Sequence, residues 1–358
     1  MHNAPALNLQ DWGFGDLGVM NSPTGGSRGL NGPQTPRLDR MAAEGTLFTD
    51  FHTMGAECSP SRASFMTGRS PSDKAVRIHL VIGDHAMNQA KGCADFLDPN
   101  TPTVTSMLRG VSGTGKTQPY TTAHFGKWHV RHCSPKSACD SPRRAAAIIS
   151  APPRLTSVVL NFDTSHLTQS SNLQLGSFGG NLSSTPPLPG APPLSAYGID
   201  ESVSYGSNPA VNAFFDVPGG HSNPFTDPWF PSNSSKMIVD LGIAFMENAT
   251  ASQRPFYLNL WFHVSHAPLW PTDEQLAAFP TSSCPGPNPG GNSRRCAMQI
   301  YRASQHEADR QIGRLLDWID AAPSGLANNT LVVFSTECVG NICCVALHWR
   351  TASCILVH

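Results

Sequence analysis

The segment with the clearest chemical potential is residues 58–68, which read CSPSRASFMTG. It begins with Cys58 and carries Arg62 four residues later. A cysteine can act as a nucleophile once it is activated, and a guanidinium can hold an anion through paired hydrogen bonds. A single cysteine is more often a small buried core residue, but here every position of the segment fits one pattern. We therefore interpret Cys58 and Arg62 as candidate catalytic residues for a reaction on an anionic group.

A second candidate segment is residues 121–129, TTAHFGKWH, which place Lys127 and His129 two residues apart. On an extended segment, both side chains would point to the same side. A lysine can neutralise the charge of an anion, and a histidine can exchange a proton near neutral pH. In isolation, the segment could be an ordinary strand end with a buried histidine. Beside residues 58–68, we interpret Lys127 and His129 as catalytic candidates.

Both segments resemble signature motifs of the type I sulfatases, which are formylglycine-dependent, arylsulfatase-like members of the alkaline phosphatase superfamily. In that family, the motif cysteine is oxidised after synthesis to formylglycine, an aldehyde, at the start of a helix. The resemblance implies that the hydrated aldehyde made from Cys58 attacks sulfur through one hydroxyl. The other hydroxyl then lets the sulfated group collapse back to the aldehyde and expel sulfate. Sister enzymes that cleave phosphate esters carry Ser or Thr as nucleophile, so Cys58 favours sulfate.

The same resemblance implies roles for the surrounding side chains. Arg62 would hold the nucleophile, Lys127 would contact the sulfate, and His129 would hold the formylglycine hydroxyl. His266 follows the apolar run PFYLNLWFH and matches the histidine of a His-x-Pro motif, which donates a proton to the leaving alkoxide or binds a sulfate oxygen. The alternatives for His266 are a structural histidine or, less favoured, a zinc site with His263. On a strand, side chains three residues apart point to opposite faces.

The resemblance further implies one calcium ion as cofactor. Gln10 and Asp11 stand where the family has two carboxylates after its first strand, and Glu337 and Cys338 stand where it has Asp and Asn. The implied ligand set is therefore Gln10, Asp11, Cys58 and Glu337. A glutamine offers only a neutral oxygen, and a thiol is a poor ligand for a hard cation. These changes favour a competing hypothesis, a catalytically inactive sulfatase-like protein that binds sulfated glycans.

A third hypothesis comes from residues 110–117, GVSGTGKT, which match the phosphate-binding P-loop pattern. A P-loop needs a buried strand before it and a helix after it. Residues 103–109 instead suggest a short helix, and Pro119 blocks an immediate helix. An NTPase is therefore a remote alternative, and we interpret the segment as a Gly-rich insertion in a surface loop.

The composition excludes some classes of function. The chain has 358 residues with 24 Lys+Arg, 25 Asp+Glu and a net charge of −1, which argues against nucleic-acid binding through bulk charge. It contains no apolar run of about 18 residues, so we expect no membrane span. The expected partners are a sulfated small molecule or glycan as substrate and the formylglycine-generating enzyme.

Ten cysteines are many for a cytosolic enzyme. Their spacing suggests disulfide-closed loops between Cys284 and Cys296 and between Cys133 and Cys139, with unpaired loop thiols as the alternative. The first residues contain no signal-peptide pattern, and we expect the N-terminus to be incomplete. The resemblance nevertheless implies the secretory route, with a lysosomal or extracellular destination.

The elements that must position these residues alternate between strands and helices. Apolar periodicity and capping residues predict helices over 35–44, 235–248 and 297–320, and strands over 46–51, 255–262 and 328–337. The resemblance implies an α/β, alkaline-phosphatase-like fold, a mixed β-sheet flanked by helices on both faces, with the C-terminal subdomain missing. The catalytic domain would span 1–337, with an irregular Pro/Ser/Gly-rich insertion at about 131–220. We interpret 338–358 as an aberrant tail, a translated intron or frame error.

Overall fold

The computed structural model of the chain describes residues 3–20, 34–55, 57–79, 85–110, 119–130, 192–205, 234–266, 269, 271–279, 296–337 and 343–348. Several predicted features lie outside this part, namely the side chain of Gln10, residues Cys133, Cys139, Cys284 and Cys338, and most of the P-loop-like segment. Cys296 is disulfide-bonded, but its predicted partner Cys284 is among the residues not described. None of the described helices is long and apolar enough to cross a membrane.

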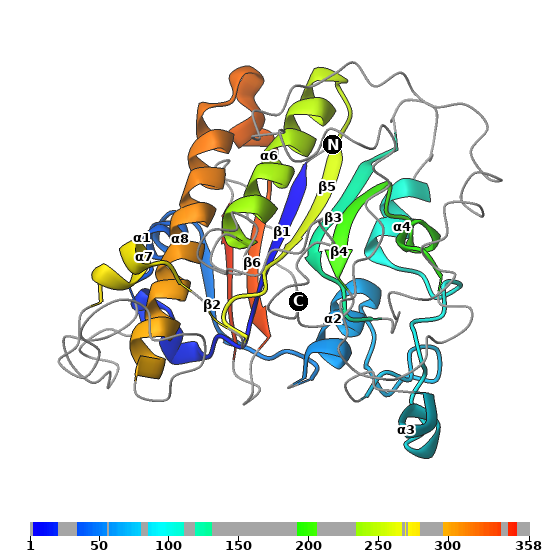
Figure 1. The fold of residues 1–358 in the computed structure, drawn as a ribbon. Helices are drawn as coiled ribbons and strands as arrows, with labels where there is room; N and C mark the ends of the chain where they lie inside the picture. Colours follow the sequence, from blue (N-terminus) through cyan, green and yellow to red (C-terminus); the bar gives the residue numbers. More distant parts are fainter. Residues whose placement is uncertain are drawn as a thin grey trace, which may run out of the picture.

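The described strands form one seven-stranded sheet in the order β2-β7-β6-β1-β5-β3-β4 (Figure 1). Their bounds are β1 Ala4–Gln10, β2 Thr46–Phe51, β3 Thr121–Lys127, β4 Glu201–Tyr205, β5 Phe256–Trp261, β6 Val332–Glu337 and β7 Cys343–His348. β1, β3, β4, β5 and β6 pair in parallel with their neighbours among these strands. β7 pairs antiparallel with both β2 and β6. The carboxyl ends of the parallel strands therefore meet at one edge, where open α/β sheets bind ligands.

The helices lie on both sides of this sheet. Their bounds are α1 Pro36–Glu44, α2 Cys58–Thr67, α3 His85–Ala90, α4 Val104–Gly110, α6 Ser234–Ala251, α7 Asp273–Ala277 and α8 Ala297–Ala321. Short 3-10 helices are η1 Phe14–Asp16, η2 Gly18–Met20, η6 Leu194–Tyr197 and η9 Pro323–Asn329. Figure 1 shows α6 and α8 side by side along the sheet. The mixed sheet with helices on both faces confirms the predicted fold class.

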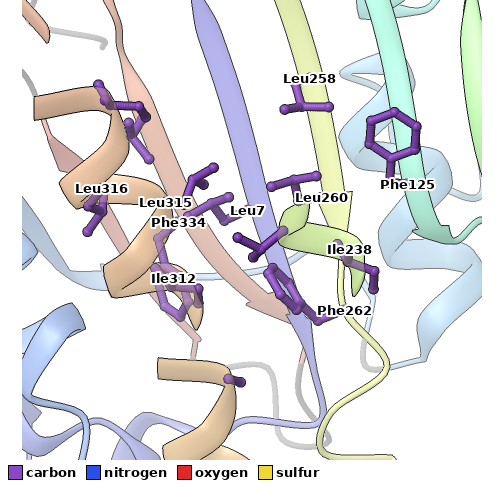
Figure 2. Packing of buried hydrophobic residues seen from close by; sticks show 14 of the residues in the cluster. Leu7, Phe125, Ile238, Leu258, Leu260, Phe262, Ile312, Leu315, Leu316 and Phe334 are labelled. Atoms are coloured by element: carbon purple, nitrogen blue, oxygen red, sulfur yellow. The ribbon is translucent and has the colours of Figure 1, made fainter. Parts of the chain in front are cut away.

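The alternation of β5 separates two hydrophobic layers. Leu258 and Leu260 point into the main core with residues of α6 and α8, such as Ile238 and Leu315 (Figure 2). Trp261, of opposite parity, joins a second cluster that also contains Met66 of α2. Successive strand residues face opposite sides of a sheet, so α2 covers the face opposite α6 and α8.

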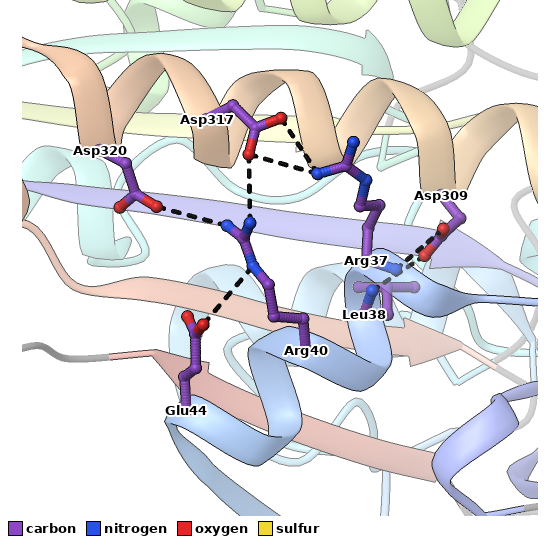
Figure 3. A network of polar contacts seen from close by, with 7 residues as sticks. All are labelled: Arg37, Leu38, Arg40, Glu44, Asp309, Asp317 and Asp320. Carbon is purple, nitrogen blue, oxygen red and sulfur yellow. Dashed lines mark hydrogen bonds and ion pairs between the residues drawn. The ribbon is translucent and has the colours of Figure 1, made fainter.

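Polar contacts from α8 fix the position of α1 (Figure 3). The Asp309 carboxylate accepts hydrogen bonds from the backbone N–H groups of Arg37 at 3.1 Å and Leu38 at 2.9 Å. Asp309 thus caps the N-terminus of α1. Thr35, at the N-cap position, makes no side-chain cap bond of its own. Burial raises the pKa of Asp309 to about 6. Exposed ion pairs from Arg37 and Arg40 to Asp317 add little to stability.

Most sequence-predicted elements are confirmed, and two strands were missed. The helices predicted at 35–44, 235–248 and 297–320 appear as α1, α6 and α8, and the predicted strands as β2, β5 and β6. β4 lies within the region predicted to be irregular. It was missed because its sequence, ESVSY, is short and polar and gives a weak strand signal. β7 lies within the predicted aberrant tail, and it pairs between β2 and β6. The interpretation of that tail's origin stays a prediction.

Candidate active site

Helix α2 carries Cys58 and Arg62 into the site. It begins at Cys58, as the resemblance implied, and ends before Gly68, whose φ of 66° closes the helix in the left-handed conformation. Side chains four residues apart share one face of a helix. Cys58 is 9% exposed and Arg62 is fully buried, so the guanidinium must find its partners inside the protein.

Arg62 finds these partners at the ends of two strands. Its Nε donates a hydrogen bond of 3.1 Å to Glu337 Oε1, and its Nη2 donates to the same oxygen. Its Nη1 donates to the backbone carbonyl of Lys127. Burial raises the pKa of Glu337, while the charges of Arg62 and Lys127 act in the opposite direction. The predicted catalytic arginine and the predicted metal ligand Glu337 are thus one buried ion pair.

Lys127 completes the cluster. It ends β3, is fully buried, and places Nζ 3.3 Å from the Cys58 Sγ. Burial lowers the pKa of Lys127. Burial also raises the pKa of the Cys58 thiol, with Glu337 adding to that effect and Lys127 and Arg62 opposing it. A thiol with a raised pKa is a weak nucleophile at neutral pH, so the geometry does not favour catalysis by an unmodified thiolate.

Gly126 explains how Lys127 reaches this position. It pairs with Trp261 across β3 and β5 and has a φ of 113°. A Cβ at Gly126 would lie 1.9 Å from the Trp261 carbonyl oxygen, a distance that no real side chain shows. Only glycine lets β3 approach β5 this closely just before Lys127.

The structure corrects the argument made for His129. β3 ends at Lys127, and His129 has a φ of 51°. The alternation of an extended strand therefore does not apply, and it cannot be used to place Lys127 and His129 on one side. Both side chains are nevertheless buried, His129 with 5% exposure.

Asp11 and His266 lie at the more open side of the site. Asp11 directly follows β1 with a φ of 58°, and its N–H donates to the Glu337 carbonyl at 2.7 Å. His266 Nε2 lies 4.0 Å from Asp11 Oδ2, with both side chains about one third exposed. Tyr301 of α8 donates to Asp16 at 2.8 Å and to the Asp11 carbonyl at 3.3 Å. Sequence reasoning missed Tyr301, which faces this loop from the scaffold helix.

The prediction that His263 and His266 lie on a strand was wrong. β5 ends at Trp261, so strand alternation does not apply to either histidine. The His266 N–H donates to the His263 carbonyl at 2.9 Å, and the two ring centroids lie 5.9 Å apart. Within the described part of the chain, no group of three or more His, Cys, Asp or Glu side chains is arranged to hold a metal ion.

The calcium expectation rests on Asp11 and Glu337. Their backbones are hydrogen-bonded to each other, and the charge of Asp11 raises the pKa of Glu337. Glu337 Oε2 is buried without a hydrogen-bond partner among the described residues. A buried carboxylate oxygen without a partner is costly, and a hard cation would satisfy it. The partnerless Glu337 oxygen is therefore a position that would accept a cation, although the described residues bring no group of three or more His, Cys, Asp or Glu side chains together around a metal position.

The element that precedes the P-loop-like segment is not the one that a P-loop needs. Helix α4, Val104–Gly110, leads into GVSGTGKT and includes its first residue, whereas a P-loop follows a buried strand. The short helix predicted at 103–109 is confirmed instead.

Comparison with known proteins gives the same result as the motifs. The sequence model described as Sulfatase matches residues 11–336. The chain is 27% identical to "Arylsulfatase G" of Rattus norvegicus and 25% identical to "N-acetylgalactosamine-6-sulfatase" of the same species, covering 94% of this chain in both cases. It spans 51% and 49% of these relatives, about half of their length.

Solved structures agree on the fold. The PsFucS1 sulfatase from Pseudoalteromonas sp. superposes with a TM-score of 0.56 at 18% identity, covering 98% of this chain and 62% of that one. BT4656 in complex with its substrate D-glucosamine-2-N,6-O-disulfate superposes with a TM-score of 0.53 at 15% identity, covering 98% and 71%. With the family model matching most of its length, the chain belongs to the sulfatase family.

Proposed function

We propose that this chain hydrolyses sulfate esters, using a formylglycine made from Cys58. The observation that carries the proposal is the meeting of Cys58, Arg62 and Lys127 in one buried cluster. It lies at the carboxyl ends of parallel strands. Two buried cations beside one nucleophile position suit a sulfate ester, which carries one negative charge and gains a second as sulfate is released. The start of α2 adds the positive end of a helix dipole at the same point.

Each residue has a proposed role. Formylglycine at position 58 would supply a hydrated aldehyde as nucleophile, which a thiol of raised pKa does not offer. Arg62 and Lys127 would neutralise charge on the sulfate oxygens as the ester bond breaks. His266, one third exposed and 4.0 Å from Asp11, would protonate the leaving alkoxide. His129, buried beyond the end of β3, would hold the nucleophile's hydroxyl.

Calcium is part of the proposal. Asp11 and Glu337 would hold the ion, Glu337 through the oxygen that Arg62 does not occupy, with Gln10 and position 58 as the further ligands. A bound calcium ion would polarise the sulfate group as a Lewis acid.

The substrate class follows the relatives by analogy. Their names include an arylsulfatase and a sulfatase of an amino sugar, and one neighbour binds a sulfated glucosamine. We propose a sulfated small molecule or glycan as substrate and the formylglycine-generating enzyme as partner. The disulfide at Cys296 supports the secretory route, lysosomal or extracellular.

The test is hydrolysis of 4-nitrophenyl sulfate by the chain co-expressed with a formylglycine-generating enzyme. We expect release of 4-nitrophenol from the sulfate and much less from 4-nitrophenyl phosphate. Cys58→Ala should abolish turnover. Cys93→Ala is the matched control, because Cys93 is a buried cysteine of the described part of the chain that lies near His79 instead. Equal activity in the wild-type chain and Cys58→Ala would refute the proposal.

A second candidate is a non-catalytic sulfatase-like protein that binds sulfated glycans. The observation that favours it is the changed ligand set, with Gln10 where the family has a carboxylate and Cys338 where it has Asn. Calorimetry with a sulfated oligosaccharide separates the two functions. Binding without turnover, together with an unconverted Cys58, supports the binder.

A further inference from the structure

An aromatic group lies beneath the guanidinium of Arg62. The Cζ atom of Arg62 is 4.8 Å from the centroid of the Trp261 ring. Both side chains are fully buried, so this cation–π contact is desolvated, the situation in which such contacts are strongest. Trp261 ends β5, and nothing in the sequence motifs pointed to it.

Trp261 is itself held in place by other rings. Trp128 stacks on it with centroids 5.8 Å apart and an interplanar angle of 16°. His124 packs edge-on against Trp261 at 4.9 Å and against Trp128 at 5.0 Å. Burial, together with the charge of Arg62, lowers the pKa of His124 to about 3. The imidazole is therefore neutral at physiological pH and adds no repulsion to Arg62.

The contacts of Arg62 divide into two kinds. A guanidinium is planar, and its N–H groups lie in that plane. The hydrogen bonds to Glu337 and to the Lys127 carbonyl therefore fix Arg62 along its edge. The Trp261 ring supports a face of the same group, which hydrogen bonds cannot do.

We infer that Trp261 is a positioning residue, whose ring sets the orientation of Arg62 and, through the Lys127 carbonyl, the end of β3 that carries the second cation. The inference rests on the proposed function, since it concerns the cations that would hold the sulfate. Trp261 acts through Arg62, whose guanidinium it contacts. Backbone pairing of Trp261 with Gly126 ties the ring to the same strand end.

The first readout is the Nε–H resonance of Arg62 in a ¹H–¹⁵N spectrum, assigned by its loss in Arg62→Lys. In the wild-type chain, we expect this proton to be protected from exchange and shifted by the ring current of Trp261. Trp261→Phe should keep the protection because an aromatic face remains. Trp261→Leu should lose it. Trp318→Leu is the control for loss of an indole, since Trp318 packs on the main core from α8.

The second readout is steady-state hydrolysis of 4-nitrophenyl sulfate. Trp261→Leu should lower kcat by about 10-fold or more, the effect of losing one desolvated cation–π contact. Trp261→Phe should stay within about threefold of the wild type. A Trp261→Leu variant that keeps both the protected resonance and the wild-type kcat overturns the inference. A wild-type chain without turnover overturns the proposed function instead, and the resonance then still decides whether Trp261 positions Arg62.

Discussion

Arg62 and Glu337 form a completely buried ion pair across 275 residues of sequence, joining helix α2 to the end of strand β6. Arg62 is 0% and Glu337 1% exposed. Neither charge could remain buried without the other, because desolvation of an isolated ion is very costly. The pair therefore couples the candidate catalytic helix to the sheet and leaves one Glu337 oxygen for a cation.

The first prediction concerns removal of this countercharge. Glu337→Gln should destabilise the chain by about 3–5 kcal/mol, because it leaves the Arg62 charge buried without compensation. Urea denaturation followed by circular dichroism measures the free energy of unfolding.

Asp317→Asn provides the matched control for that experiment. It also removes a carboxylate that pairs with arginines, but Asp317 is 47% exposed. The expected cost is within about 1 kcal/mol. If both variants lose a similar free energy of unfolding, breaking the buried pair is no more destabilising than breaking an exposed one, which contradicts the prediction.

The second prediction concerns Gly126. Gly126→Ala should prevent native pairing of β3 with β5, because the new Cβ would meet the Trp261 carbonyl at 1.9 Å and the φ is 113°. We expect little folded protein, as judged by gel filtration and by the melting temperature.

Gly68→Ala separates this clash from backbone strain alone. Gly68 also has a positive φ, 66°, but a Cβ there meets nothing within 4 Å. It should cost only about 1–2 kcal/mol. If Gly126→Ala is as well folded as Gly68→Ala, the close approach of β3 and β5 is not required.

The third prediction concerns the pH dependence of stability. The folded-state pKa of Asp309, about 6, is above its ordinary value of 3.8 because of burial. The folded chain therefore keeps a proton that the unfolded chain has already lost, and this contribution to stability falls as pH rises from about 4 to about 6. Asp309→Asn lacks that contribution. The free energy of unfolding of the variant, relative to the wild type, should thus increase over this pH range.

Urea titrations at several pH values between about 4 and 7 measure this difference. Asp317→Asn serves again as the control for the loss of a carboxylate that is exposed at the surface. A flat difference for Asp309→Asn would mean that Asp309 has an ordinary pKa in the folded chain.

The fourth prediction concerns the thiol form of Cys58, studied in chain made without the formylglycine-generating enzyme. The charge of Lys127 lowers the pKa of Cys58, and the charge of Glu337 raises it. Lys127→Met should therefore slow alkylation of Cys58 by iodoacetamide at pH 8, and Glu337→Gln should speed it. Peptide mass spectrometry follows the reaction, with Cys93 in the same sample as internal reference. Equal rates in the two variants would be inconsistent with the electrostatics described for the site.

The sequence predicted the local parts of this site well. Cys58 with Arg62 and Gly126 with Lys127 each lie within one short segment, so their spacing is set by local structure and does not depend on the rest of the fold. The ends of β1 and β6 could also be placed, because Asp11 and Glu337 stand where the resembling family has carboxylates at its strand ends.

The long-range and conformational parts could not be predicted. The partnership of Arg62 with Glu337 depends on a sheet order that no local pattern specifies. Strand alternation could not be applied to His129, because β3 ends at Lys127 and His129 has a positive φ. Trp261 was missed because a tryptophan in an apolar run predicts core packing, and only the folded chain brings Arg62 onto its ring.

The most direct measurement is the mass of the proteolytic peptide that contains Cys58, from chain expressed in a secretory host with the formylglycine-generating enzyme and assayed for 4-nitrophenyl sulfate hydrolysis. The account predicts a peptide with the mass of the aldehyde in place of the thiol, and turnover that rises with the converted fraction. The mass of the same peptide shows whether the formylglycine-generating enzyme still converts Cys58 in Arg62→Lys. Where it does, Arg62→Lys should lower the turnover of the converted chain. A fully converted Cys58 in a folded chain without turnover, or an unconverted Cys58, would contradict the central claim that this cluster hydrolyses sulfate esters.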